Sequence, residues 1–189
     1  KRWPGGIVPY RLHSNLADED SLQNRIKEAM AEYKEKTDNH IKFVPYNKSR
    51  HDKYVEFKGK DYNGEFCGRS GFGLPSSKTR KIKLQTGNSF SAADKECVIH
   101  EIGHALGLFH EQARMDRDNF VKIHYDRIQK EKKGEFKKYV KKAIDIGPYD
   151  CDSVIHYPKD AFRKDGITED TITSVNPAVC EEIDGPTRG

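Results

Sequence analysis

The sequence lacks any uninterrupted run of about 18 apolar residues, so it predicts no membrane-spanning helix. It also lacks an N-terminal signal peptide and begins at Lys1 rather than Met, which favours a mature product whose targeting segment and pro-segment have been removed. No internal repeat and no low-complexity linker divides the chain. With 189 residues, 34% charged and 34% hydrophobic, the chain is expected to form one globular domain, with room for two lobes.

Cysteine is scarce, and none of the 4 residues forms a C-x-x-C pair, so a structural zinc site is not expected. An even number of cysteines in a chain of this kind fits an oxidising compartment, so a secreted, extracellular protein is expected. Three pairings are open for Cys67, Cys97, Cys151 and Cys180. We favour Cys67–Cys97 and Cys151–Cys180, which place one disulfide in each half of the chain.

Charge of one sign is also limited, because the net charge is only +4. The densest basic run, Lys130–Lys142, is interpreted as the solvated face of a helix in preference to a polyanion-binding face, and no nucleic-acid partner is expected. Gly134 weakens this helix in the middle. The apolar residues expected on its buried side are Ile128, Phe136, Val140 and Ile144. The glycine-rich loop 63–75 has no Gly-Lys-Ser/Thr after it, so a phosphate-binding loop is not predicted.

Local patterns predict a helix followed by short strands. Apolar residues at helical spacing predict a helix over Asp18–Lys36, and Pro9 marks an edge strand near the start of the chain, because proline cannot donate to a ladder. Three further strands are expected over Ile41–Val44, Tyr54–Phe57 and Lys81–Gln85. This order predicts the α+β class, with a small mixed sheet and two helices in the N-terminal part.

The segment from His100 to His110 fits the extended pattern H-E-x-x-H-x-x-G-x-x-H. On a helix, His100 and His104 project from the same face, one turn apart. Gly107 can adopt the left-handed conformation that ends a helix, and the turn then returns His110 as a third ligand. Three nitrogens with an open position describe a catalytic zinc site, so one Zn²⁺ is predicted.

Glu101 would face the attacking water rather than the metal, as a general base. A buried helix with two core histidines is the less favoured interpretation of the same motif. Ser91 followed by Asp94 resembles a capping box at the start of the helix. Cys97 lies near the ligand face and is an alternative fourth ligand, although a disulfide is favoured because a closed site would not be catalytic.

The chain resembles the astacin family of metzincin zinc endopeptidases over nearly its whole length. After the zinc motif, Glu111 and the run R-x-D-R-D at Arg114–Asp118 continue as in that family. The opening W-x-G-G-x-x-P-Y at Trp3–Tyr10 and the Phe43-Val44-Pro45 strand also match. Ser153-Val154-Ile155-His156-Tyr157 stands where the family carries its Met-turn.

The resemblance implies a two-lobed fold, with lobes at about 1–107 and 108–189 and an active-site cleft between them. It implies zinc ligation by His100, His104 and His110, and Glu101 as general base. It further implies that Tyr157 is an additional zinc ligand at rest that swings away to stabilise the transition state. Secretion as a pro-enzyme, with an inhibitory pro-segment removed on activation, also follows from the resemblance.

The chain departs from the family pattern in three places. Ile155 replaces the methionine of the Met-turn, and an aliphatic side chain of similar bulk should be tolerated there. His40 occupies a region where the family usually has a cysteine that pairs with one near the C-terminus. The disulfide Cys151–Cys180 would replace that missing disulfide. The family's last helix is absent after Gly189, through trimming or in a short variant.

The carboxylate of Glu111 is expected to pair with a nearby arginine. Asp116, Arg117 and Asp118 are expected to form a structural ion-pair cluster rather than a calcium site.

The predicted function is therefore that of a secreted endopeptidase that acts on protein or peptide substrates, and the protein is expected to be a monomer. Arg188 is the candidate for selecting acidic residues just after the scissile bond. A zinc-containing binding or adhesion module that has lost catalysis is the competing hypothesis, disfavoured because Glu101 and Tyr157 are both present. A polyanion-binding protein acting through Lys130–Lys142 is a second competitor.

Overall fold

The computed structural model describes residues 1–63, 66–87, 93–139, 143–181 and 183. The chain forms two compact units, residues 1–108 and 109–188, which are described separately. Among the described residues, no helix combines the length and apolar character needed to cross a bilayer.

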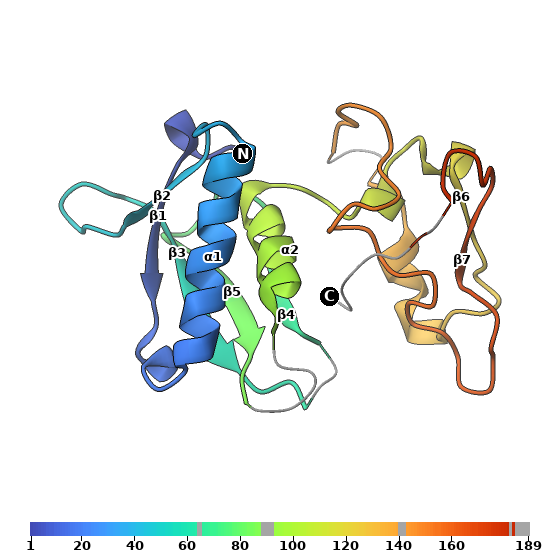
Figure 1. Cartoon of the computed structure of the whole chain (residues 1–189), viewed down its shortest axis with the longest axis horizontal. Coiled ribbons are helices and arrows are strands. Elements are labelled where there is room, and N and C mark those ends of the chain that lie inside the picture. Colours follow the sequence, from blue (N-terminus) through green and yellow to red (C-terminus); the bar gives the residue numbers. More distant parts are fainter. Residues whose placement is uncertain (64–65, 88–92, 140–142, 182, 184–189) are drawn as a thin grey trace. The chain divides into compact units, whose positions relative to one another are not determined.

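The first unit is built on a five-stranded mixed sheet with the strand order β2-β1-β3-β5-β4 (Figure 1). Neighbouring pairs are parallel except β4 with β5, which is antiparallel. The strands are β1 Ile7–Leu12, β2 Lys42–Pro45, β3 Tyr54–Lys60, β4 Gly68–Ser70 and β5 Thr79–Gln85. The predicted α+β class with a small mixed sheet is confirmed, although β4 was not predicted.

The prediction that Pro9 marks an edge strand is wrong. Strand β1 lies between β2 and β3, and β2 is the edge strand. Proline fits because pairing with β3 begins only at Tyr10, opposite Val55, so the missing N–H of Pro9 lies just before that ladder. A central strand can therefore hold proline where one of its two ladders starts.

Two helices, α1 Asp20–Lys36 and α2 Lys95–Leu106, lie side by side on one face of the sheet (Figure 1). Leu22, Ile26, Ala29 and Met30 recur at helical spacing and are the buried residues of α1. They pack with apolar residues of the strands and α2 in one core. The strand residues of that core are Val8, Val55, Phe57, Ile82 and Leu84. Trp3 closes one end, where its indole Nε1–H donates to the Ala105 carbonyl at 2.8 Å.

The second unit has little regular structure. Its described elements are the antiparallel strands β6 Val121–Ile123 and β7 Ile172–Ser174 and the short 3-10 helices Glu111–Ala113, Arg117–Asn119 and Lys130–Phe136. A compact core holds it together, and its fully buried members include Val121, Ile128, Phe136 and Ile172.

The lysine-rich run does not form the predicted α-helix. Its described part is a 3-10 helix over Lys130–Phe136 that gives way to extended backbone at Lys137. Ile128 and Phe136 are buried as predicted, whereas Ile144 is 85% exposed and Val140 lies outside the described residues. Gly134 lies inside this segment and disfavours a regular helix, as glycine does in helix interiors.

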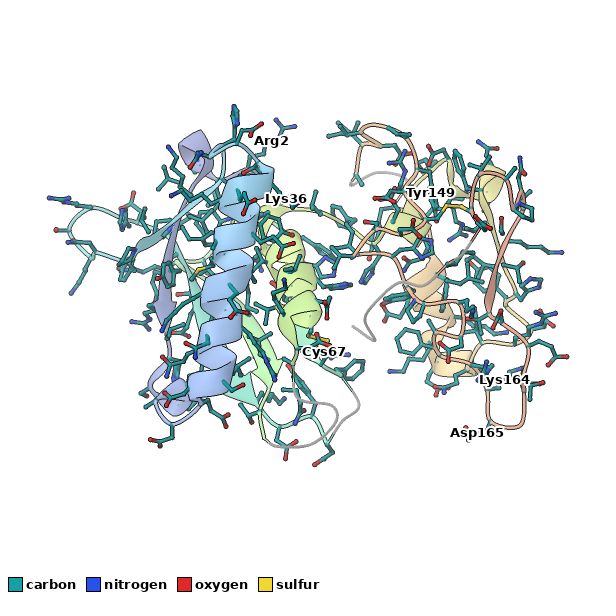
Figure 2. All side chains as sticks on the ribbon, viewed as in Figure 1. Arg2, Lys36, Cys67, Tyr149, Lys164 and Asp165 are labelled. Atoms are coloured by element: carbon teal, nitrogen blue, oxygen red, sulfur yellow. A yellow bond between two sulfur atoms is a disulfide. The ribbon has the colours of Figure 1, made fainter. Side chains whose placement is uncertain are left out.

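Both predicted disulfides are confirmed. Cys67 is joined to Cys97 in the first unit, and Cys151 to Cys180 in the second. Figure 2 shows Cys67 with its sulfur beside the start of α2. The first bond excludes Cys97 as a fourth metal ligand and ties α2 to the segment that leads into β4. The second bond holds the segment before His156 to the chain near residue 180.

Candidate metal centre

The start of α2 is fixed by Asp94, whose side chain accepts a hydrogen bond from the Cys97 backbone N–H at 2.8 Å. An aspartate cap of this kind satisfies one of the free amides in the first helical turn. The other half of the predicted capping box, Ser91, lies outside the described residues. From this start, the helical repeat places His100 and His104 on one face.

The helix ends at Gly107, as predicted. Gly107 has a φ of 113°, and its N–H donates to the carbonyls of Gly103 and His104 at 3.1 and 2.9 Å. The Leu108 N–H also donates to the Gly103 carbonyl, at 3.0 Å. A side chain at this φ would be strained, so glycine allows the sharp turn that leads to His110.

The three predicted ligands come together. His100, His104 and His110 are buried, and their candidate ligand atoms all lie within 4.8 Å of one another. Three imidazoles at this spacing match the protein ligands of a catalytic zinc site. Nitrogen donors of this kind suit zinc better than calcium or magnesium, which prefer oxygen.

His104 is prepared for ligation by its surroundings. Its Nδ1 lies 2.8 Å from the Leu108 carbonyl, which can only accept, so Nδ1 carries the proton and Nε2 is left with its lone pair. Burial lowers the pKa of His104, although the hydrogen bond to Leu108 opposes this shift. A neutral ring with one nitrogen already bonded is the form that binds a metal ion.

Glu101 is almost fully buried, at 2% exposure. Its Oε2 has no hydrogen-bond partner among the described residues. Burial raises the pKa of Glu101 to about 8, and the positive charge of Arg69 opposes this shift. A buried carboxyl oxygen without a partner is costly, so it indicates that a polar or charged group completes the site.

Room for Glu101 is provided by Gly68, a residue that sequence reasoning missed. A Cβ added to Gly68 would stand 2.8 Å from the Glu101 Cγ and 3.2 Å from the Lys83 carbonyl oxygen. Strand β4 therefore passes close to the carboxyl side chain only because position 68 has no side chain. Gly68 is one of several glycines in the loop 63–75, and the sequence alone gives no signal that this one faces Glu101.

Tyr157 lies against His110 in the second unit, with their ring centroids 4.3 Å apart. Its backbone N–H donates to Oε1 of Gln112 at 3.0 Å, and its side chain is 3% exposed. Gln112 is itself fully buried two residues after His110. The segment that follows the third histidine thus fixes the backbone of Tyr157, a connection that sequence reasoning also missed.

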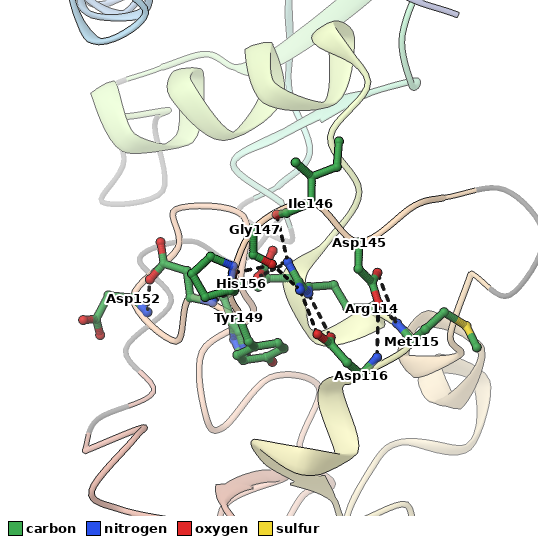
Figure 3. Close-up of polar contacts among 12 residues, drawn as sticks. Arg114, Met115, Asp116, Asp145, Ile146, Gly147, Tyr149, Asp152 and His156 are labelled. Atoms are coloured by element: carbon green, nitrogen blue, oxygen red, sulfur yellow. Dashed lines mark hydrogen bonds and ion pairs between the residues drawn. The ribbon is translucent and has the colours of Figure 1, made fainter.

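A series of two hydrogen bonds also connects Tyr149 to the backbone of Tyr157 through the His156 side chain. Figure 3 shows Tyr149 and His156. His156 Nδ1 lies 2.6 Å from the Tyr157 carbonyl, so this nitrogen is the donor. His156 Nε2 then accepts from the Tyr149 hydroxyl at 2.6 Å. Burial lowers the pKa of His156 and raises the pKa of Tyr149, so both groups are neutral. Neighbouring Ile155 is buried, and its carbonyl accepts from the Glu111 N–H at 3.1 Å.

The predicted ion pairs are present. Arg114 Nη1 lies 3.2 Å from Glu111 Oε1. The Arg114 guanidinium also donates to both carboxylate oxygens of Asp116, at 2.9 and 2.8 Å. Figure 3 shows Arg114 also facing the backbone of Gly147, whose carbonyl accepts at 3.0 Å. Glu111 is thus satisfied by an arginine, as expected, and by the Asp150 N–H at 3.1 Å.

The rest of the cluster surrounds Arg117. It pairs with Asp118 at 2.9 Å and donates to the carbonyls of Gln112 and Phe136 at 2.8 and 2.6 Å. Lys138 approaches the other oxygen of Asp118 at 2.6 Å. The carboxylates of Asp116 and Asp118 therefore both form ion pairs, and the R-x-D-R-D segment is a structural ion-pair cluster. Arg188, the predicted specificity residue, lies outside the described residues.

A mixed sheet, a histidine-bearing helix ended by glycine and a third histidine beyond the turn define a zinc-metallopeptidase type of domain. Comparison with family models agrees: residues 1–186 match the model of the astacin peptidase family, and the chain belongs to this family. Its sequence is 38% identical to zinc metalloproteinase nas-14 of Caenorhabditis elegans over 170 residues, which are 88% of this chain and 31% of the relative.

Two fish proteins are also similar. Low choriolytic enzyme of Oryzias latipes is 36% identical over 183 residues, which are 93% of this chain and 60% of that protein. The solved structure of high choriolytic enzyme 1, a hatching enzyme zinc-protease from the same fish, superposes with a TM-score of 0.77 at 25% identity. That match covers 100% of this chain and 87% of the other. The chain spans about a third of the length of nas-14 and of similar curated relatives.

Proposed function

We propose that this chain is the catalytic domain of a secreted zinc endopeptidase that hydrolyses internal peptide bonds of proteins. The observation that carries the proposal is the cluster of three buried histidines next in sequence to a buried carboxyl group with an unsatisfied oxygen. Family membership and the two disulfides support it.

In this proposal His100, His104 and His110 hold one zinc ion. Zinc held there supplies a positive charge that polarises the scissile carbonyl, acidifies water and favours the ionised form of Glu101. The Leu108 carbonyl keeps the His104 proton on Nδ1 and so presents Nε2 as the donor.

Glu101 acts as the general base. Its carboxylate takes a proton from the attacking water as the water oxygen bonds to the scissile carbonyl carbon. The carbon–nitrogen bond then breaks, and Glu101 delivers the proton to the leaving amine. The Oε2 atom, buried and without a described partner, is the atom proposed to exchange this proton.

Tyr157 is proposed as a further ligand in the resting enzyme. During reaction its phenol would donate a hydrogen bond to the oxygen on which negative charge develops. Its ring contact with His110 and its backbone bond to Gln112 support a position beside the third ligand.

The test compares two histidine variants for zinc content and for hydrolysis of denatured casein. His110→Ala should lose bound zinc and activity together. His124→Ala should keep both, because His124 contacts Thr173 Oγ1 at 2.9 Å and is not part of the cluster. A chelator should abolish hydrolysis by the wild-type protein, and added zinc should restore it. Zinc-loaded wild-type protein that leaves every denatured protein intact would favour the binding-module hypothesis instead.

A further inference from the structure

The face of the five-stranded sheet opposite α1 and α2 is strongly basic. Side chains alternate along a strand, so residues between the core positions Val55, Phe57, Ile82 and Leu84 point to the opposite face. These outward positions carry a set of cations that we name the basic sheet face. Its members are Lys58, Lys60, Arg69, Lys81 and Lys83.

The strand register places like charges directly opposite each other. Lys83 of β5 pairs with Lys58 of β3 on one side and with Arg69 of β4 on the other. Three cations thus form one row across three adjacent strands, about 4.8 Å apart from strand to strand. Like charges in such cross-strand pairs destabilise a sheet, so the row has a cost that an anionic ligand would offset.

Carboxylates among the described residues form no ion pair with this row, although Arg69 is near enough to Glu101 to lower the pKa of that carboxyl group. Glu56 lies on the same face, opposite Lys81 in the strand register, but its ion pair is with Arg11, whose Nη2 lies 2.6 Å from Glu56 Oε1. Asp61, which follows β3, accepts from the Gln85 amide at 2.9 Å. Within the described part of the chain, no carboxylate forms an ion pair with any member of the basic sheet face.

A pocket of about 440 Å³ opens on this surface. Its charged lining consists only of cations, namely Lys60, Arg69, Arg80, Lys81 and Lys83. The Arg80 guanidinium is held in place because it donates to the carbonyls of Gly73 and Phe72, both at 2.9 Å. Hydroxyl-bearing Ser70, Ser77 and Thr79 also line the pocket, together with Tyr62, whose own hydroxyl oxygen is buried. Cations beside several hydroxyls match a ligand that carries both anionic groups and hydroxyls.

We propose that the basic sheet face binds a linear anionic polysaccharide that bears sulfate or carboxylate groups. The row of cations fits an extended chain of repeated charges, and the hydroxyl-lined pocket fits a sugar ring. Single-stranded nucleic acid needs exposed aromatic rings for stacking. Here the Tyr62 ring is covered by Lys60 at 4.9 Å and the Phe66 ring by Arg69 at 4.1 Å.

The experiment measures binding to heparin, a sulfated polysaccharide, by titration calorimetry at about 0.15 M salt, for three proteins. These are the wild type, the variant Lys58→Gln/Lys81→Gln/Lys83→Gln, and a control with the same charge change, Lys130→Gln/Lys133→Gln/Lys137→Gln. Removal of three cations from the face should weaken binding on the order of 100-fold. The control should bind within about threefold of the wild type, because its three lysines belong to the second unit and are not members of the basic sheet face.

Folding is monitored by the melting temperature. The face variant should melt no lower than the wild type, because the substitutions relieve repulsion between Lys58 and Lys83, and Glu56 opposite Lys81 keeps its ion pair with Arg11. Should it melt lower, Lys83→Gln alone replaces it, since Lys83 stands at the centre of the row. Heparin should raise the melting temperature of the wild type and control only.

Three results would overturn the proposal. These are failure of the wild type to bind heparin, equal weakening in the face variant and the control, and duplex DNA or polyglutamate bound as tightly as heparin. None of these results depends on peptidase activity, so the proposal stands or falls separately from the proposed function.

Discussion

At the scale of single residues, two positions without reactive groups support the proposed chemistry. Gly107 lets the chain turn from the second histidine to the third, and Gly68 leaves space for Glu101. The His-Glu-His pattern could be predicted because five positions of restricted residue type recur at fixed spacing. The role of Gly68 could not, because it depends on how β4 pairs with β5 and passes Glu101.

Substitution of Gly68 by alanine tests this contact. The added Cβ would stand 2.8 Å from the Glu101 Cγ, so the carboxyl group must shift. A misplacement of this size should lower kcat by about 10²-fold while zinc content is unchanged. Gly134→Ala is the matched control, because a Cβ there meets no atom within 4 Å. Equal kcat values for the two variants would show that Gly68 does not position Glu101.

At the scale of elements, sequence patterns predicted what was long or strongly periodic. Helix α1 and strands β2, β3 and β5 were predicted within a few residues, because apolar side chains repeat along them. Strands β4, β6 and β7 were missed, since each is 3 residues long and too short to show a period. The lysine-rich run has apolar residues at helical spacing but forms only a 3-10 helix over Lys130–Phe136, because Gly134 disfavours a regular α-helix there.

The segment from Tyr149 to Tyr157 is an irregular element held by side-chain hydrogen bonds. Tyr149→Phe would remove the hydroxyl that donates to His156, and would leave a buried nitrogen without its partner. The free energy of unfolding should fall by about 1–3 kcal/mol in urea denaturation. Tyr46→Phe, at a half-buried position with no described hydroxyl bond, should change it by less than about 0.5 kcal/mol. A Tyr149 variant as stable as the Tyr46 variant would contradict the assigned hydrogen bond.

At the scale of the whole molecule, disulfides and ion pairs compensate for the sparse regular structure of the second unit. The pairing of the four cysteines could be chosen from the sequence by keeping each bond within one half of the chain. The hydrogen bonds that reach the backbone of Tyr157 could not be predicted from the sequence. Gln112, Tyr149 and His156 belong to no recognisable sequence pattern, and only the folded structure brings them into contact.

Acid should weaken the ion pairs of this unit. The pKa of Asp116 lies below its ordinary 3.8 because Arg114 hydrogen-bonds its carboxylate, and Lys138 lowers the pKa of Asp118 in the same way. A lowered pKa in the folded state means that the stabilisation is complete above the ordinary value and is lost as the pH falls below it. The free energy of unfolding should therefore decrease on acidification from about pH 5 to pH 2.

Urea unfolding at a series of pH values measures this slope. Asp116→Asn/Asp118→Asn should flatten it, because the two carboxyl groups no longer titrate. Asp165→Asn, at an exposed position without a described ion pair, should leave the slope unchanged. A double variant with the wild-type slope would mean that other groups cause the acid sensitivity.

The proposed chemistry depends above all on Glu101, the residue proposed to move the proton during hydrolysis beside the three-histidine cluster. The most direct test is the kcat of Glu101→Gln on denatured casein, determined with the zinc content of the same sample. Glutamine preserves the shape of the side chain but cannot accept the proton. We expect one zinc ion per chain and a kcat lowered by about 10²–10⁴-fold. A fully zinc-loaded Glu101→Gln protein with kcat within about threefold of the wild type would contradict this role.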